Sequence, residues 1–282
     1  MGNAPTRSDS WSNDAPSGEP VTFRAADPWG ALPGREPVLS GYLARPNFSA
    51  ASGAGRHGIV LSHGFPEADQ VVAPGYGYPA LAERIAAQTG SVVLTFNFRG
   101  TGSSGGDFSL GGWRADLRAA IAYLCSVTEV ERVWLVGFAA GGTLSICAAG
   151  EDPSLAGVAA FAPPAEFVQD VSDARRLLVQ ARALGVIRDT GFPSDTAAWV
   201  RELTEVRPVQ LAAKLPPRPL LIVHGANDET VPLTDARVLA EAANASAELR
   251  VLPGAGHRLL YDPRAMALLV GWFDRNLGYV DQ

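Results

Sequence analysis

From about residue 21 onward, short segments rich in β-branched and aromatic residues alternate with longer segments of helical periodicity. We expect strands at 21–25, 38–43, 58–62, 92–98, 132–138, 157–162, 220–224 and 249–252. We expect helices at 78–88, 113–125, 140–149, 232–244 and 264–276. This alternation predicts an α/β fold, with helices on both faces of an eight-stranded, mostly parallel sheet. Ligands of such sheets bind at the carboxyl ends of the strands.

The chain is long and apolar enough to bury one extensive core. It has 282 residues, 47% of them hydrophobic, and no apolar run near the roughly 18 residues that a membrane-spanning helix needs. Residues 1–20 are rich in Ser, Asn, Pro and Gly and contain nothing like a signal peptide, so they are expected to form a disordered tail. We therefore expect one domain over residues 21–282, with no membrane span.

Charge and reactive side chains exclude several classes of partner and cofactor. The net charge of −6 disfavours nucleic acid as a partner. The four histidines lack the spacing of metal ligands, and no phosphate-binding loop is present, so neither a metal nor a cofactor is expected. Cys125 and Cys147 each lie in a helical segment and form no Cys-x-x-Cys pair, so we interpret both as core thiols of a cytoplasmic protein.

A glycine-rich turn between a buried strand and a helix carries the strongest functional signal. The strand at 132–138 is followed by a helix that begins near Ala140, and Gly137 and Gly141 flank the junction. In the pattern Gly-x-Ser-x-Gly at such a turn, the glycines let strand and helix approach closely, and the serine is pushed up into the active site. Here the central residue is Ala139. The sequence therefore predicts a nucleophile elbow without its attacking hydroxyl.

Three further motifs follow predicted strands. They are Leu61-Ser62-His63-Gly64-Phe65-Pro66, the run Val-His-Gly-Ala-Asn-Asp-Glu-Thr-Val-Pro at 223–232, and Pro253-Gly254-Ala255-Gly256-His257. Together with the elbow and the Arg-Gly-Thr-Gly-Ser-Ser turn at 99–104, they resemble the α/β-hydrolase superfamily over about residues 38–277. The likeness is to the serine esterase and acyl-hydrolase branch, similar to dienelactone hydrolases or serine aminopeptidases.

The resemblance implies a role for each of these turns. It assigns the nucleophile position, the triad acid and the general base, in chain order, to Ala139, Asp228 and His257. The backbone N–H groups of Phe65 and Ala140 would form the oxyanion hole. His63 is expected to brace its turn rather than to react. Such a site would act on a small-molecule ester, thioester or amide through an acyl-enzyme.

Neighbouring side chains offer alternatives at two of these positions. Glu229 lies beside Asp228, but the family pattern places the carboxylate four residues after His224, which favours Asp228. Ser103 and Ser104 are candidates for a displaced nucleophile. Serines in glycine-rich turns commonly make local hydrogen bonds, which favours a structural role for both.

Between the sixth and seventh predicted strands lies an insertion at about 166–214, long enough for three short helices over the strand ends. We expect it to form a small helical lid. Its arginines Arg175, Arg176 and Arg182 would either meet a carboxylate of the substrate or form a solvated helix face, and the second interpretation is favoured.

Ala139 admits three explanations that differ in kind. In the first, the parent enzyme has serine there, and alanine replaces it by design in an otherwise complete esterase, thioesterase or amidase. In the second, the alanine is natural, and His257 oriented by Asp228 acts as a general base without a covalent intermediate. In the third, the chain binds a small molecule without catalysis. Retention of Asp228, His257 and both oxyanion turns weighs against the third explanation.

Overall fold

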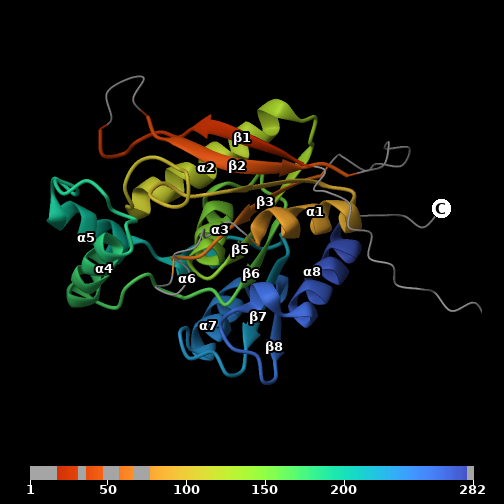
Figure 1. The fold of residues 1–282 in the computed structure, drawn as a ribbon. Helices are drawn as coiled ribbons and strands as arrows, with labels where there is room; N and C mark the ends of the chain where they lie inside the picture. The colour runs from red at the N-terminus through yellow and green to blue at the C-terminus, as the bar shows by residue number, and fades with distance from the viewer. Residues whose placement is uncertain (1–17, 31–35, 47–56, 67–76, 278–282) are drawn as a thin grey trace, which may run out of the picture.

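Eight strands pair side by side in one sheet (Figure 1). They are β1 (Glu19–Arg24), β2 (Val38–Ala44), β3 (His57–Ser62), β4 (Val92–Phe96), β5 (Arg132–Phe138), β6 (Gly157–Phe161), β7 (Leu220–Gly225) and β8 (Ala247–Leu252). The computed structural model describes residues 18–30, 36–46, 57–66 and 77–277. The strand order is β1-β2-β4-β3-β5-β6-β7-β8, with β2 antiparallel to both neighbours and the remaining pairs parallel. The predicted eight-stranded, mostly parallel sheet is confirmed.

Helices connect the strands at all five predicted places and at three places within the insertion. They are α1 (Tyr78–Thr89), α2 (Leu110–Val127), α3 (Ala140–Glu151), α4 (Val171–Ala183), α5 (Thr196–Glu205), α6 (Pro208–Ala212), α7 (Leu233–Ala243) and α8 (Pro263–Asn276). The start of α2 was predicted three residues late. The Ser109 hydroxyl accepts a hydrogen bond from the N–H of Gly112, and this cap begins the helix at Leu110.

Two predicted boundaries are wrong for identifiable reasons. β4 ends at Phe96 and not at Phe98, because the Phe98 N–H binds the Nε2 atom of His63, 3.1 Å away, and leaves the strand ladder. The predicted tail at 1–20 extends too far, because Glu19 and Pro20 already pair with β2 in β1. The rest of that predicted tail, residues 1–17, lies outside the described residues.

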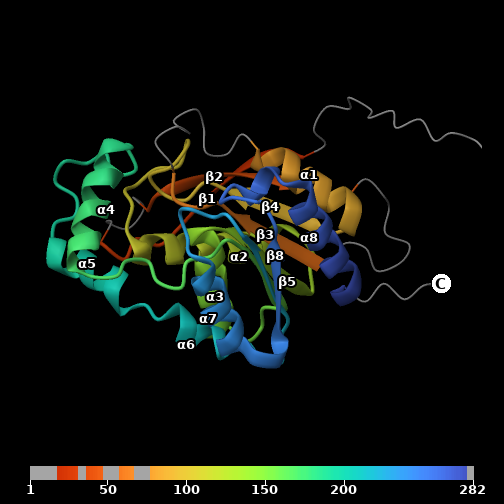
Figure 2. The same cartoon turned by 90° about the horizontal axis from the view of Figure 1, so that it is seen from below.

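The two faces of the sheet pack against different helices. Alternate residues of β3 show this, because Ile59 and Leu61 join the core that contains α1 and α8, whereas Val60 joins the core that contains α2, α3 and α7. Figure 2 shows α1 and α8 on the opposite side of the sheet from α3 and α7. Strands buried on both faces explain the continuous apolar runs in the sequence.

The insertion between β6 and β7 divides into two parts. The helices α4 and α5, at 171–205, lie beyond the carboxyl ends of the strands at the left of Figure 1, and we call this pair the lid. The third helix, α6, contacts α3 and α7 instead, so it belongs to the body of the domain. The prediction that all three helices cover the strand ends is therefore wrong for α6, whose Pro208 and Ala212 are buried.

Polar contacts fix the lid to the loop that precedes α2 and to the first turn of α2. The indole N–H of Trp199 donates to the carbonyl of Phe108 at 3.0 Å, and the Phe108 N–H donates to the carbonyl of Val186 at 3.0 Å. The Glu202 carboxylate accepts the N–H of Gly111 at 2.9 Å. Because lid and loop share these bonds, they form one unit above the strand ends.

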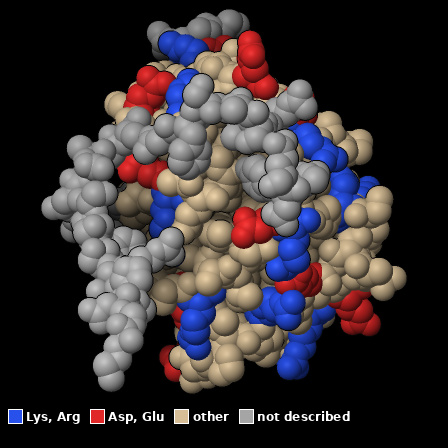
Figure 3. All heavy atoms as spheres, turned by 90° about the vertical axis from the view of Figure 1, so that its right-hand side faces the viewer, with Lys and Arg blue, Asp and Glu red and all other residues tan. Residues whose placement is uncertain are grey.

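The surface carries charges of both signs. Figure 3 shows Lys and Arg side chains interspersed with Asp and Glu on the face that is the right-hand side of Figure 1.

One of the two cysteines differs from the prediction. Cys147 is buried as predicted, but Cys125 is exposed. Its neighbour Leu124 faces the core, and a helix turns by about 100° per residue, so Cys125 faces away from the core. No helix within the described ranges is both long and apolar enough to span a membrane.

Candidate active site

Position 139 lies on a strained turn between β5 and α3. Ala139 has φ 47° and ψ −123°, a conformation that residues other than glycine seldom adopt, and its N–H donates to the carbonyl of Phe161 on β6 at 2.7 Å. A Cβ added to Gly137 would lie 2.3 Å from the carbonyl oxygen of Gly141, so strand and helix approach closely only because position 137 is glycine. The backbone geometry expected of a nucleophile elbow is thus present around an alanine.

Asp228 and His257 form a hydrogen-bonded pair at the ends of β7 and β8. The Nδ1 atom of His257 lies 2.8 Å from Oδ2 of Asp228, whose side chain is fully buried. The other carboxylate oxygen accepts the N–H groups of Thr230 and Val231 at 2.9 and 2.8 Å. A carboxylate can only accept, so Nδ1 carries the proton, and the lone pair of the His257 Nε2 atom is left free to accept one.

The two loops that carry this pair are bonded to each other. The N–H of Ala226 donates to the carbonyl of Leu252 at 2.9 Å, and the N–H of Asn227 donates to the carbonyl of Ala255 at 2.8 Å. A Cβ on Gly225 would lie 2.5 Å from that same Ala255 oxygen, so the approach requires glycine. These contacts bring Asp228 to a histidine 29 positions further along the chain.

A second histidine lies behind the carboxylate. His224 is fully buried, and its Nε2 atom lies 2.9 Å from the carbonyl of Val231 and 3.5 Å from Oδ2 of Asp228. Because the carbonyl can only accept, Nε2 carries a proton that points into the turn between Asp228 and Val231. His224 therefore supports this turn, a role that the sequence motif did not indicate although His224 is part of it.

The predicted oxyanion turn lies at the same cavity as Ala139 and His257. Both Phe65 and Ala140 line the cavity described below, and neither backbone N–H is paired with an acceptor among the described residues. The Ala140 N–H is free because it opens α3, where the first N–H groups have no partner within the helix. Two unpaired donors at these positions are what a developing oxyanion requires.

His63 is buried and supports this turn. Its Nε2 atom accepts the N–H of Phe98 at 3.1 Å, so Nδ1 carries the proton and donates to the carbonyl of Gly64 at 2.6 Å. Burial lowers the pKa of His63 from 6.5 to about 4, and this hydrogen bond to Gly64 only partly opposes the effect. The ring is therefore neutral at neutral pH, as the bracing role requires.

A cavity of about 270 Å³ lies between the strand ends and the lid. Ala139 and His257 both line it. The body of the domain and the lid each form one apolar wall. The body wall consists of Phe65, Phe108, Leu110 and Trp113, and the opposite wall consists of Phe167, just before the lid, with Leu177 and Leu203 of the lid. Most pockets for small molecules are lined in this way, with a few polar groups that orient the ligand.

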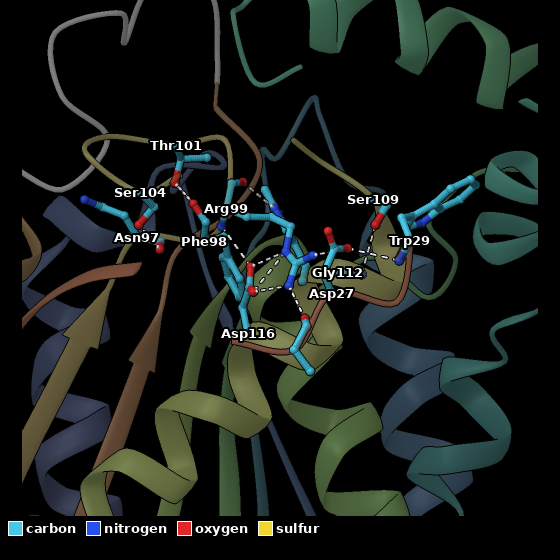
Figure 4. A network of polar contacts seen from close by, with 12 residues as sticks. Asp27, Trp29, Asn97, Phe98, Arg99, Thr101, Ser104, Ser109, Gly112 and Asp116 are labelled. Atoms are coloured by element: carbon cyan, nitrogen blue, oxygen red, sulfur yellow. Dashed lines mark hydrogen bonds and ion pairs between the residues drawn. The ribbon is translucent and has the colours of Figure 1, made fainter. Parts of the chain in front are cut away.

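A buried ion-pair network holds the body wall of this cavity (Figure 4). The guanidinium of Arg99, 2% exposed, binds the fully buried carboxylate of Asp116 at 2.7 Å and the carboxylate of Asp27 at 3.1 Å. Burial raises the pKa of Asp116, and Arg99 opposes that shift. The carbonyl of Arg99 accepts the indole N–H of Trp113 at 3.1 Å, so the network also positions a ring of the wall.

Several candidates named from the sequence lie outside the site. The buried Ser104 hydroxyl donates to the carbonyl of Asn97 at 2.6 Å and accepts the N–H of Ser40 at 3.0 Å, which is the structural role favoured for this turn. Ser103 is exposed and does not line the cavity. Glu229 is exposed as well, and the carboxylate bonded to His257 belongs to its neighbour.

The lid arginines also point away from the cavity. Arg175, Arg176 and Arg182 are all exposed, and none of them lines the cavity. Arg176 pairs with Asp173 on the same helix, and Arg182 donates to the carbonyl of Phe192 at 3.0 Å. The solvated helix face is thus the arrangement that the structure shows. Glu166, which no sequence pattern singled out, lines the cavity instead.

Comparison with known proteins places the chain in a family. The model described as the alpha/beta hydrolase family matches residues 59–268, which is more than half of the 282 residues. Given this match, together with the sheet order and the elbow, the chain belongs to the α/β-hydrolase family. No curated protein sequence matches the chain significantly. Within the described ranges, no three His, Cys, Asp or Glu side chains gather as a metal ion would need.

Solved structures share the fold at low sequence identity. The alpha/beta hydrolase GrgF from Penicillium sp. sh18 is 18% identical, with a TM-score of 0.69 over 93% of this chain and 99% of its own. The esterase Pf2001 of Pyrococcus furiosus is 19% identical, with a TM-score of 0.64 over 93% and 91%. Est1E from Butyrivibrio proteoclasticus is 19% identical, with a TM-score of 0.61 over 91% and 97%. The likeness to esterases therefore concerns the fold.

Proposed function

We propose that this chain is a serine-hydrolase scaffold for small-molecule esters, in which Asp228 and His257 are the acid and the base and Ala139 occupies the place of the nucleophile. One observation carries the proposal. A histidine bonded at 2.8 Å to a fully buried carboxylate lines the same cavity as the strained turn at position 139. The N–H groups of Phe65 and Ala140, which have no acceptor in the part of the chain that the structure describes, support it.

A hydroxyl at position 139 would complete a recognised sequence of steps. The serine oxygen attacks the ester carbonyl, and the Nε2 atom of His257 takes its proton. The N–H groups of Phe65 and Ala140 hold the oxyanion of the tetrahedral intermediate. The imidazolium, stabilised by Asp228, then protonates the leaving alcohol, and water hydrolyses the acyl-enzyme by the same route.

The test compares this chain with its Ala139→Ser variant. We expect the serine to raise turnover of p-nitrophenyl acetate and butyrate by roughly a hundredfold or more and to make the protein react with a fluorophosphonate probe. The variant Ala148→Ser, with the same replacement further along α3, should change neither readout. Adding His257→Ala to the Ala139→Ser variant should abolish both gains. A serine variant that folds but neither turns over ester nor labels would disprove the proposal.

A second candidate is a non-covalent enzyme that uses the chain as it stands. It is favoured by the complete hydrogen bonding of Asp228 and His257, which needs no residue at position 139. The free Nε2 atom of His257 can activate a water held in the cavity, and serine proteases that lack a triad member retain roughly a thousandfold acceleration over water. In this case, His257→Gln in the unaltered chain would lower its ester hydrolysis to the buffer rate.

A further inference from the structure

The body wall of the cavity is a fixed cluster of aromatic rings. The ring of Phe108 lies edge to face with those of Phe65 and Trp113, at centroid distances of 5.1 and 4.8 Å. Trp113 also stacks on Phe98 at 4.5 Å and is tied by its indole N–H to the carbonyl of Arg99. A ligand ring can join such a cluster in offset or edge-to-face contact, without a change in the rings already present.

The space available suits a small apolar group. Its volume of about 270 Å³ lies just under the usual range for drug-sized ligands. Half-buried Phe167 and Leu177 face the body wall from the lid side. A substituted benzene ring between two apolar walls would replace water that finds few hydrogen bonds there.

Fixed charge is scarce among the described residues that line this cavity. Glu166 is the only lining residue among those described that carries a fixed charge, and its exposed side chain lies at the boundary with solvent. No arginine or lysine is among the described lining residues, and Arg175, Arg176 and Arg182 lie elsewhere on α4. The N–H groups of Phe65 and Ala140 could receive an oxygen of either a neutral carbonyl or a carboxylate. Only the carboxylate would face Glu166, without an Arg or Lys counter-charge among the described lining residues.

We propose that the cavity binds uncharged aromatic acyl compounds and that Glu166 selects against the aromatic carboxylate of the same shape. The ring would lie between the partly buried side chains of Phe65 and Leu177, with the carbonyl directed to the N–H groups of Phe65 and Ala140. The inference rests on the proposed function, because it concerns the same cavity. For an ester hydrolase the selection has a direction: the neutral ester enters, and the carboxylate product is expelled.

Binding to the unaltered chain tests this without any chemistry. Titration calorimetry would compare benzamide, benzoate and cyclohexanecarboxamide, which are neutral aromatic, anionic aromatic and neutral aliphatic ligands of similar size. We expect benzamide to bind about tenfold more tightly than benzoate and about threefold more tightly than cyclohexanecarboxamide. Glu166→Gln should strengthen benzoate binding about fivefold and leave benzamide unchanged. The control Glu205→Gln, an exposed acid outside this cavity, should change neither.

A second pair of variants fixes the location of binding. Leu177→Trp fills the cavity from the lid and should abolish benzamide binding, whereas Val179→Trp, at a side chain of the same helix that is 67% exposed, should not. Equal affinity for benzamide and benzoate, or equal effects of Glu166→Gln and Glu205→Gln, would overturn the charge selection. Absence of benzamide binding, or no loss with Leu177→Trp, would overturn the site. These outcomes are separate from the Ala139→Ser result, which alone decides the proposed function.

Discussion

The two halves of the candidate site are built in different ways. The half formed by the turns after β3, β4 and β5, which we call the elbow half, is held by glycine contacts, aromatic packing and the buried ion pair of Arg99 and Asp116. The half formed by the turns after β7 and β8, the acid–base half, is held by backbone hydrogen bonds between its two loops, by His224 and by one carboxylate that accepts three hydrogen bonds. The elbow half differs in having aromatic packing and a buried ion pair, although position 139 within it carries only a methyl side chain. Its backbone holds the strained conformation at position 139 with no polar side chain there.

The largest expected effect tests the acid–base half. In the Ala139→Ser variant, Asp228→Asn should lower kcat by roughly 10⁴, as in the well-studied serine proteases, because an amide at this position favours the wrong tautomer of His257. Ester turnover measures the effect. The matched control is Glu229→Gln, which removes an exposed neighbouring carboxylate and should leave kcat nearly unchanged. A similar loss in both variants would mean that the acid has been wrongly assigned.

The next effect tests the construction of the elbow half. Arg99→Met should lower the free energy of unfolding by about 3–5 kcal/mol, because it leaves the fully buried Asp116 without its partner. Urea unfolding gives the value, and adding Asp116→Leu should restore most of the loss. Arg118→Met, which breaks an exposed pair with Glu151, should cost less than about 1 kcal/mol. Equal costs would show that the buried pair does not hold this half together.

A pH effect follows from His63, which belongs to the elbow half. Its folded pKa of about 4 is below the unfolded value of 6.5, so the unfolded chain binds the proton first as the pH falls. The neutral form of His63 contributes about 3 kcal/mol to the free energy of unfolding above pH 6.5, and this contribution is lost as the pH falls from 6.5 to 4. Unfolding measured at pH 7.5 and 4.5 should show a smaller pH dependence for His63→Gln than for the unaltered chain. An unchanged dependence would contradict the neutral, bracing histidine.

The smallest effect measures the strain in the elbow itself. Ala139→Gly should raise the free energy of unfolding by about 1 kcal/mol, because glycine adopts φ 47° and ψ −123° without the steric cost that alanine bears. The same replacement within α3, Ala148→Gly, should lower it by about 1 kcal/mol. Thermal or urea unfolding of the two variants gives opposite signs if the turn is strained. Two decreases would show that packing relieves the strain.

Much of the fold followed from local patterns. Continuous apolar runs gave the buried strands, and helical periodicity gave the helices that cover them. The errors arise where a contact with a residue distant in the sequence determines where a strand ends or what a helix packs against. The N–H of Phe98 ends β4 because His63 lies beside it, and α6 joins the body because α3 and α7 offer it a surface. No local pattern in the sequence indicates those contacts.

The candidate site was predicted unevenly for the same reason. The elbow and the loop positions of Asp228 and His257 were named through family motifs, and the structure brings those two side chains together. The network of Arg99 was not predicted, because its partners Asp116 and Asp27 are 17 and 72 positions away and belong to no motif. Contacts across such separations depend on the assembled sheet.

The strained elbow has a consequence for how this chain could change over generations. Because the turn keeps its conformation around alanine, a serine there needs no movement of the backbone. Every alanine codon becomes a serine codon when its first base changes from G to T. A population carrying this gene would therefore sample the serine form by single-base mutation, and growth on an ester as sole carbon source would reveal whether that form is useful.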